Sequence, residues 1–242
     1  MLSAARLLLV PVGVALVHAG PSVVALGQWT KLRSLPNGWC RWRGPDVPSV
    51  ALTFDDGPDP HGTPRVLDAL DALGLRGTFF CLGSRAAADP DLVMGVVDRG
   101  HEVALHGFAH DHHLARTPRW VLADMEAGLS ALADCGVIPR WYRPPYGQSS
   151  AATMYTARRR RLELVHWSGW GREWEAADAY AVADRVARSL EPGAIVLLHD
   201  SDDTSPSGTV DRVVDALPLI AAELQARGLT SSTMSDLVAC KV

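Results

Sequence analysis

The feature of this 242-residue sequence that most constrains its fold is a repeated alternation of short apolar runs with longer amphipathic segments. Residues 49–54 (SVALTF) form one such run between turn residues, which predicts a buried strand. Residues 63–73 follow with apolar side chains at helical spacing. Thr63 as the cap and Pro64 in the first position predict the start of a helix there.

The same alternation continues along the rest of the chain. Further strands are expected near residues 77–81, 102–105, 139–143, 162–167, 194–198 and 230–233. Helices are expected near residues 86–99, 118–133, 149–160, 177–190 and 209–227. Short strands that alternate with helices predict βα units on a parallel sheet, and a continuous run of them favours a barrel over an open sheet. We therefore expect an α/β fold with a single catalytic domain.

Charge and cysteine content exclude several classes of protein. The 23 basic and 27 acidic side chains give a net charge of −4, which argues against a nucleic-acid-binding protein. The hydrophobic content of 48% excludes a disordered or fibrous chain. No CxxC pair is present, so a zinc ribbon is not expected. The cysteines are interpreted as free thiols, with disulfide pairing as the alternative in an exported chain: Cys40, Cys81, Cys135 and Cys240.

Residues 1–30 form an apolar N-terminal segment. Arg6 precedes a stretch with no formal charge, which is typical of a signal peptide or an uncleaved anchor, and residues 7–27 are long enough to associate with a membrane. Proline and glycine interrupt the stretch and basic residues follow it, which favours a segment packed on a cytoplasmic domain. Residues 31–47 are interpreted as a linker, and residues 48–240 as the catalytic domain.

Ionisable side chains directly follow the predicted strands. In parallel α/β folds, functional residues lie just past the carboxyl ends of the strands, so side chains from separate strand ends are expected to meet. These residues are Asp55 and Asp56 after the first strand, His106 and His110 after the third, Arg143 after the fourth, and His199 after the strand ending at residue 198.

Two histidines four residues apart and one carboxylate can hold a metal ion with coordination positions left open. Such an ion lowers the pKa of its water to about 7, and a neighbouring carboxylate can take the proton. Asp55 and Asp56 supply both carboxylates. The same triad also binds iron in non-haem oxygenases, so an iron enzyme is one alternative.

The motifs TFDDGP, HGFAH, RPPYG and LLHD, in this order, resemble those of the polysaccharide deacetylases, also called carbohydrate esterase family 4 or the NodB homology domain. The resemblance covers roughly residues 49–237. It implies a distorted (β/α)7 barrel that removes acetyl groups, usually from polymers or oligomers containing N-acetylglucosamine. Together with the N-terminal segment, this leads us to expect an exported or membrane-associated enzyme facing the cell wall, with a cytoplasmic location as the alternative. The oligomeric state is left open.

The resemblance also assigns roles. It makes Asp55 the general base, held by Arg143, and His199 the general acid. The ligands of one divalent metal ion are Asp56, His106 and His110. Zinc is the expected metal, with cobalt, nickel or another divalent ion as alternatives. The backbone N–H of Tyr146 is implied as an oxyanion donor and Leu198 as a wall of the acetyl pocket. Trp167 and Trp174 are expected to line the substrate site.

One segment departs from the family pattern. Where the family often has Asp-x-x-Asp-Trp, with the first Asp supporting the catalytic histidine, this chain has Trp170, Gly171, Arg172, Glu173 and Trp174. We hypothesise that Glu173, or a carboxylate within residues 200–203, supports His199 instead. The departure keeps a sugar-binding protein with a vestigial site open as an alternative. An O-acetyl esterase is another, since the same activated water attacks an ester. The nearby His112 and His113 are expected to be exposed loop histidines.

Overall fold

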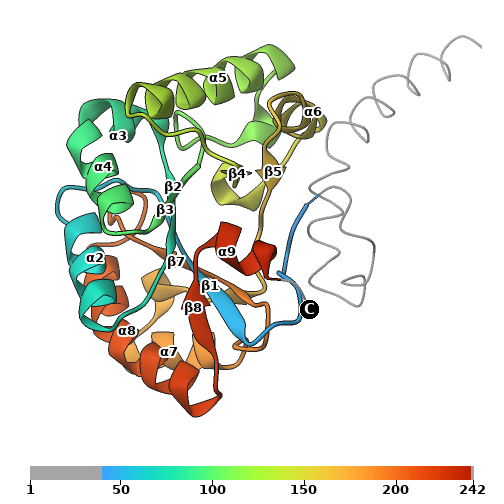
Figure 1. Ribbon diagram of the computed structural model, residues 1–242. Helices are drawn as coiled ribbons and strands as arrows, with labels where there is room; N and C mark the ends of the chain where they lie inside the picture. The colour runs from blue at the N-terminus through green and yellow to red at the C-terminus, as the bar shows by residue number, and fades with distance from the viewer. Residues whose placement is uncertain (1–39, 241–242) are drawn as a thin grey trace, which may run out of the picture.

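The structure is a computed structural model that describes residues 40–240 (Figure 1). The apolar segment 1–30, including the candidate membrane stretch 7–27, lies outside the described residues. No helix within residues 40–240 combines the length and the apolar character needed to cross a bilayer. The described part of the predicted linker lies against the domain, since backbone β-bridges join Arg41 to Val165 and Arg43 to Ala194.

Within residues 40–240, eight strands form one parallel sheet. They are β1 (Ser49–Asp55), β2 (Thr78–Cys81), β3 (Glu102–Leu105), β4 (Trp141–Tyr142), β5 (Glu163–Leu164), β6 (Gly169–Trp170), β7 (Ile195–His199) and β8 (Thr230–Ser232). The sheet order is β5-β4-β3-β2-β1-β7-β6, and β8 pairs with the first residues of β1. No ladder joins β5 to β6 within residues 40–240, so the curled sheet is open between them. The predicted α/β fold with a distorted barrel is confirmed.

Helices surround the outside of the curled sheet, except for the last one, whose Met234 and Leu237 pack into the core inside the barrel (Figure 1). They are α2 (Thr63–Ala72), α3 (Gly83–Ala88), α4 (Pro90–Asp98), α5 (Pro118–Asp134), α6 (Ala151–Arg159), α7 (Ala179–Ala187), α8 (Thr209–Ala226) and α9 (Met234–Ala239). Short 3-10 turns follow some strands: η2 (His113–Ala115), η3 (Pro145–Gly147) and η4 (Glu173–Glu175).

Two expectations about these elements were wrong, and one strand was not predicted. The helix expected over residues 86–99 is two helices, because Pro90 starts α4 and the Asp89 side chain accepts a hydrogen bond from Leu92 N at 3.1 Å. Thr63 does not cap α2, because its hydroxyl donates to Asp200 Oδ2 at 2.5 Å instead. Strand β6 was missed, because a two-residue strand between glycines has no apolar run to indicate it.

Alternation along the strands divides the buried side chains into two cores. Val50, Leu52 and Phe54 of β1 pack in the larger core that the helices cover. Ala51 belongs to a smaller core inside the barrel, which also holds Met234 and Leu237 of α9. Since successive side chains of a strand point to opposite faces, Thr53 and Asp55 also face the interior. The inner face of β1 therefore ends on a carboxylate.

Candidate active site

The same alternation brings four candidate residues to one end of the barrel interior. Asp55 ends the inner face of β1, and His199 ends that of β7, two residues past the inner-facing Leu197. His106 follows Leu105 of β3, which packs in the outer core, and Arg143 follows Tyr142 of β4, which does the same. Ladder pairing of Asp55 with His199 confirms that the strand ends lie level.

Arg143 is fully buried and holds the carboxylate of Asp55. Its NH1 donates to Asp55 Oδ1 at 2.6 Å and to Thr53 Oγ1 at 2.8 Å. Its NH2 donates to the carbonyl of His166 at 3.0 Å, and the guanidinium lies 4.1 Å over the Phe80 ring. Because these contacts fix Arg143 on several sides, the carboxylate of Asp55 has one defined orientation.

Asp56, His106 and His110 form a compact group of potential metal ligands. One ligand atom from each lies within 4.8 Å of the others. Asp56 Oδ1 is 3.3 Å from His106 Nε2 and 3.2 Å from His110 Nε2, and it is buried without a hydrogen-bond partner among the described residues. Asp56 has a positive φ of 79°, which turns it away from the face of Asp55.

The surroundings of His106 and His110 leave one ring nitrogen of each histidine able to bind a cation. His106 Nδ1 lies 2.7 Å from the carbonyl oxygen of Arg143, which accepts a hydrogen bond from it, so Nε2 is the ring nitrogen that faces the ligand group. Burial lowers the pKa of His110 to about 4, which leaves that imidazole neutral at neutral pH. Two imidazole nitrogens converge on a carboxylate oxygen that has no hydrogen-bond partner within residues 40–240, so the three residues fit a divalent metal ion.

Glu173 supports His199. Its Oε1 lies 2.7 Å from His199 Nδ1, and the Glu173 side chain is fully buried. Burial alone lowers the pKa of His199, but the Glu173 carboxylate, with smaller contributions from Asp56 and Asp55, raises it to about 9. His199 Nε2 is left facing the ligand group, 4.0 Å from Asp56 Oδ2.

The other carboxylates considered as partners of His199 are engaged elsewhere. Asp200 accepts from Gly57 N at 3.0 Å and from Thr63. Asp202 accepts from Val210 N at 2.7 Å at the start of α8, and Asp203 pairs with Arg85. Of the alternatives within residues 170–203, Glu173 is therefore the carboxylate that contacts His199.

Gly171 makes room for this contact. A Cβ at that position would lie 2.8 Å from Glu173 Oε2 and 2.7 Å from Leu198 Cδ2. Leu198 itself packs in the outer core and is fully buried, so it does not face the site as expected. Leu197, on the same face as His199, takes that direction instead, because the side chains of β7 alternate.

Aromatic side chains extend from the site. Tyr146 has a positive φ of 58° and its ring stacks on His112 with centroids 3.7 Å apart. Trp174 meets His199 edge to face at 5.4 Å, and Trp170 lies 5.1 Å from Trp174. Trp167 continues the row, 5.3 Å from Trp170. These three indoles are half-buried: Trp174 contacts His199, and Trp167 also packs against the core inside the barrel.

Asp124 was missed by the sequence analysis, although it holds the loop that carries the histidines. It accepts from Phe108 N at 3.1 Å and Ala109 N at 2.9 Å, and it lies 3.4 Å from His113 Nε2. His113 is fully buried there, which corrects its expected exposure. A single aspartate inside an amphipathic helix has no pattern that sets it apart. Thr204, which donates to Asp56 Oδ2, was missed for a similar reason.

We expect Asp124→Asn to weaken metal binding about 10-fold, the low end of the effect of losing an outer partner. The amide keeps one acceptor but turns an N–H₂ group toward a backbone N–H, which moves the loop between His106 and His110. Metal affinity is measured by competition with a chromophoric chelator. Glu126→Gln is the control, because Glu126 lies on the same helix and pairs with the exposed Arg160. A lower Tm with unchanged metal affinity would show that Asp124 only stabilises the fold.

A family model for polysaccharide deacetylases matches residues 43–165. The chain belongs to the polysaccharide deacetylase family. A chitooligosaccharide deacetylase of Sinorhizobium fredii is 37% identical over 210 residues, which cover 83% of this chain and 94% of that protein. A peptidoglycan-N-acetylglucosamine deacetylase of Bacillus cereus is 31% identical over 216 residues, 87% of this chain and 76% of that protein.

Solved structures agree with this family. A peptidoglycan N-acetylglucosamine deacetylase matches with a TM-score of 0.79 and 27% identity, covering 88% of this chain and 99% of that chain. A family 4 carbohydrate esterase from Streptomyces lividans, in complex with acetate, matches with a TM-score of 0.69 and 34% identity. The match covers 76% of this chain and 91% of that chain. Polysaccharide deacetylases of this family depend in general on a metal ion, and Asp56, His106 and His110 are the candidate ligands in this one.

Proposed function

We propose that this enzyme hydrolyses N-acetyl groups on a carbohydrate, namely a polymer or oligomer that contains N-acetylglucosamine. The observation that carries the proposal is the position of two opposite proton-transfer groups beside one ligand set. Asp55 Oδ2 lies 3.9 Å from His106 Nε2, and His199 Nε2 lies 4.0 Å from Asp56 Oδ2. Hydrolysis of an amide needs a base for the water and an acid for the amine within reach of the same bond.

Asp56, His106 and His110 would hold the metal ion, for which we propose zinc because two imidazoles and a carboxylate suit it. When bound, such an ion polarises the acetyl carbonyl and makes a water molecule more acidic. Asp55, oriented by Arg143, takes a proton from the water as the water oxygen bonds to the carbonyl carbon. His199 gives its proton to the nitrogen as the carbon–nitrogen bond breaks, which leaves acetate and a free amine.

Glu173 gives His199 its role as the acid. The carboxylate at 2.7 Å from Nδ1 keeps the imidazole protonated at neutral pH, with a pKa of about 9. An amine leaves poorly without a proton, whereas the alcohol released from an ester needs one less. A retained, charged acid therefore favours an amide substrate over an O-acetyl ester. It also argues against a vestigial site.

The test is mass spectrometry of N-acetylglucosamine oligomers incubated with the zinc-loaded, full-length protein, with an O-acetylated xylan oligomer in parallel. We expect the loss of acetyl groups from the N-acetylated oligomers. Loss from the xylan oligomer alone would identify an esterase. Binding of the oligomers without loss of acetyl from either would identify a sugar-binding protein, and turnover that required oxygen would identify an iron enzyme.

We also propose that the enzyme is exported or membrane-associated and faces the cell wall. The support is the basic Arg6 before the uncharged stretch within residues 7–30. Fusion of residues 1–40 to alkaline phosphatase, which is active only outside the cytoplasm, tests this. Phosphatase activity in intact cells is expected, and activity of a cytoplasmic reporter fused at the same point would contradict the proposal.

A further inference from the structure

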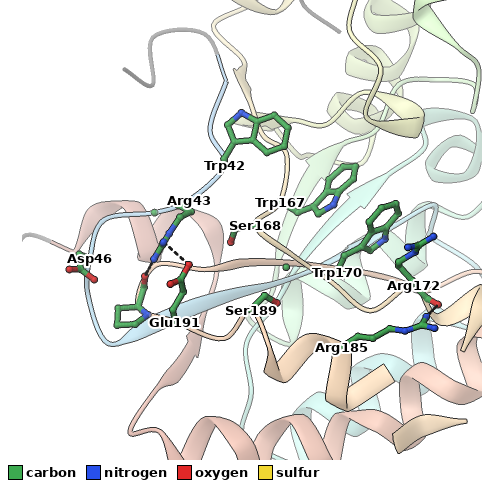
Figure 2. A pocket seen from close by; sticks show the side chains of 13 residues that line it. Trp42, Arg43, Asp46, Trp167, Ser168, Trp170, Arg172, Arg185, Ser189 and Glu191 are labelled. Atoms are coloured by element: carbon green, nitrogen blue, oxygen red, sulfur yellow. Dashed lines mark hydrogen bonds and ion pairs between the residues drawn. The ribbon is translucent and has the colours of Figure 1, made fainter. Parts of the chain in front are cut away.

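A pocket of about 730 Å³ lies on the open side of the barrel (Figure 2). Residues 42–44 form one wall and β6 with the residues before it forms another. Its volume falls within the range of about 300–1,000 Å³ that small-molecule sites occupy. None of the residues given a role in the hydrolysis above, apart from the bordering Trp167, lines it, so the pocket is separate from the metal ligands.

Aromatic rings dominate one end of the pocket. Trp42, Trp167 and Trp170 all line it, and each is half-buried. Trp42 is fixed by stacking on His166, with centroids 4.3 Å apart and planes 24° apart. Because sugar rings have apolar C–H faces, fixed indole rings at a wet pocket form a platform for them.

The same end of the pocket carries positive charge. The Arg172 guanidinium lies 5.3 Å from the Trp170 ring centroid, and Arg185 NH1 donates to the Arg172 carbonyl at 2.7 Å. Arg172 pairs with Glu175, but Arg185 forms no ion pair with a carboxylate of residues 40–240. Figure 2 shows Asp46 and Glu191 at the opposite end of the pocket, where Glu191 pairs with Arg43 at 2.5 Å. Arg185 is therefore the cation available to an anion at the aromatic end.

The row of indoles connects this end to the catalytic histidine. Trp170 contacts both Trp167, which lines the pocket, and Trp174, which contacts His199. A glycan chain with one residue at the metal centre can thus place a neighbouring residue in the pocket along a continuous aromatic surface.

We propose that the pocket is a second carbohydrate subsite, which binds a carboxylate-bearing sugar of the glycan whose N-acetyl group is hydrolysed. The proposal rests on the proposed function. Trp42 and Trp170 contact the sugar ring, and Arg185 forms a charged hydrogen bond with the carboxylate. The substrate is therefore an acidic glycan rather than a neutral homopolymer of N-acetylglucosamine.

The test measures binding, so that it does not depend on turnover. The probes are oligomers of alternating N-acetylglucosamine and N-acetylmuramic acid, with the lactyl carboxylates either free or amidated. Calorimetry uses the full-length, zinc-loaded Asp55→Asn variant. We expect the free acid to bind about 10-fold more tightly, the range of a hydrogen bond to a charged group. Arg185→Gln removes this preference and Trp170→Ala weakens both probes.

Arg188→Gln is the matched control, because Arg188 directly follows α7, the helix that carries Arg185, and pairs with the exposed Asp184. It keeps the full preference for the free acid. Equal affinity for the two probes, or a preference that survives Arg185→Gln, overturns the subsite while leaving deacetylation intact. Conversely, the subsite is supported and the proposed hydrolysis is contradicted if the preference depends on Arg185 while the parent protein, with Asp55 intact, removes no acetyl group from the oligomers.

Discussion

Asp55→Asn is expected to lower kcat for N-acetyl hydrolysis by about 10³-fold, within the range for loss of a general base. Asparagine has nearly the same shape as aspartate but cannot accept a proton from water. The substitution leaves the fully buried Arg143 without its charged partner, which costs roughly 3 kcal/mol of unfolding free energy. The kinetics are therefore measured well below the Tm of the variant, with metal content determined on the same sample.

Thr53→Val is the control for the loss of stability. It removes the second hydrogen bond of Arg143 NH1, at 2.8 Å, and the hydrogen bond from the Thr53 hydroxyl to the Val196 carbonyl, at 2.6 Å, without touching the base. We expect it to cost about 2 kcal/mol and to change kcat less than 10-fold. If Asp55→Asn retained kcat within 10-fold of the parent, Asp55 would not be the base.

Glu173→Gln is expected to have the second largest effect, a loss of about 10²-fold in kcat near pH 8. Burial disfavours the charged form of the imidazole. Without the Glu173 carboxylate to offset this, the pKa of His199 moves downward from about 9. A smaller fraction of the enzyme then carries a protonated acid. The alkaline limb of the kcat–pH profile moves to lower pH, which is the measurement that checks this.

The His199–Glu173 pair also makes the stability of the fold depend on pH. Because the pKa of His199 in the folded protein lies above its ordinary value of 6.5, the pair stabilises the fold fully below about pH 6.5 and loses its effect as the pH rises through about 9. A cation at the ligand set lowers the pKa in parent and variant alike, so the difference between them remains.

Glu175→Gln provides the matched control for Glu173. Glu175 lies two residues along in η4 and pairs with Arg172 at 2.8 Å on the surface. We expect an unchanged pH profile for this variant. An alkaline limb that stayed in place in Glu173→Gln would remove Glu173 from the mechanism.

The contact of Glu173 with His199 gives that histidine a carboxylate partner although the segment departs from the common motif of the family. Arg172 adopts a left-handed conformation with a φ of 47°, after which η4 begins with Glu173. The position where the family often has its supporting aspartate holds Trp170, which instead joins the aromatic row. A displaced carboxylate and a new pocket wall thus arise from the same segment.

The positions of Asp55, His106, Arg143 and His199 were predictable because each follows an apolar strand, and the ends of parallel strands meet. The ends of strand β1 and of helices α5 and α8 were predicted within one or two residues, since their apolar patterns extend without interruption over the whole element. The division of the helix expected over residues 86–99 was also predictable, because Pro90 is disfavoured inside a helix and favoured at the start of a new one. Strand β6 could not be predicted, because its pairing with β7 is made by backbone groups of two residues.

The sequence by itself determined the alternation of strands and helices, and with it the set of ionisable residues at one end of a parallel sheet. Hydrophobic period and the geometry of parallel strands suffice for that. Only the tertiary structure decided that Glu173 supports His199, that Leu197 rather than Leu198 shares its face, and that Asp124 holds the metal loop. These contacts join residues 15 to 26 positions apart or depend on strand register, and local periodicity contains no information about either.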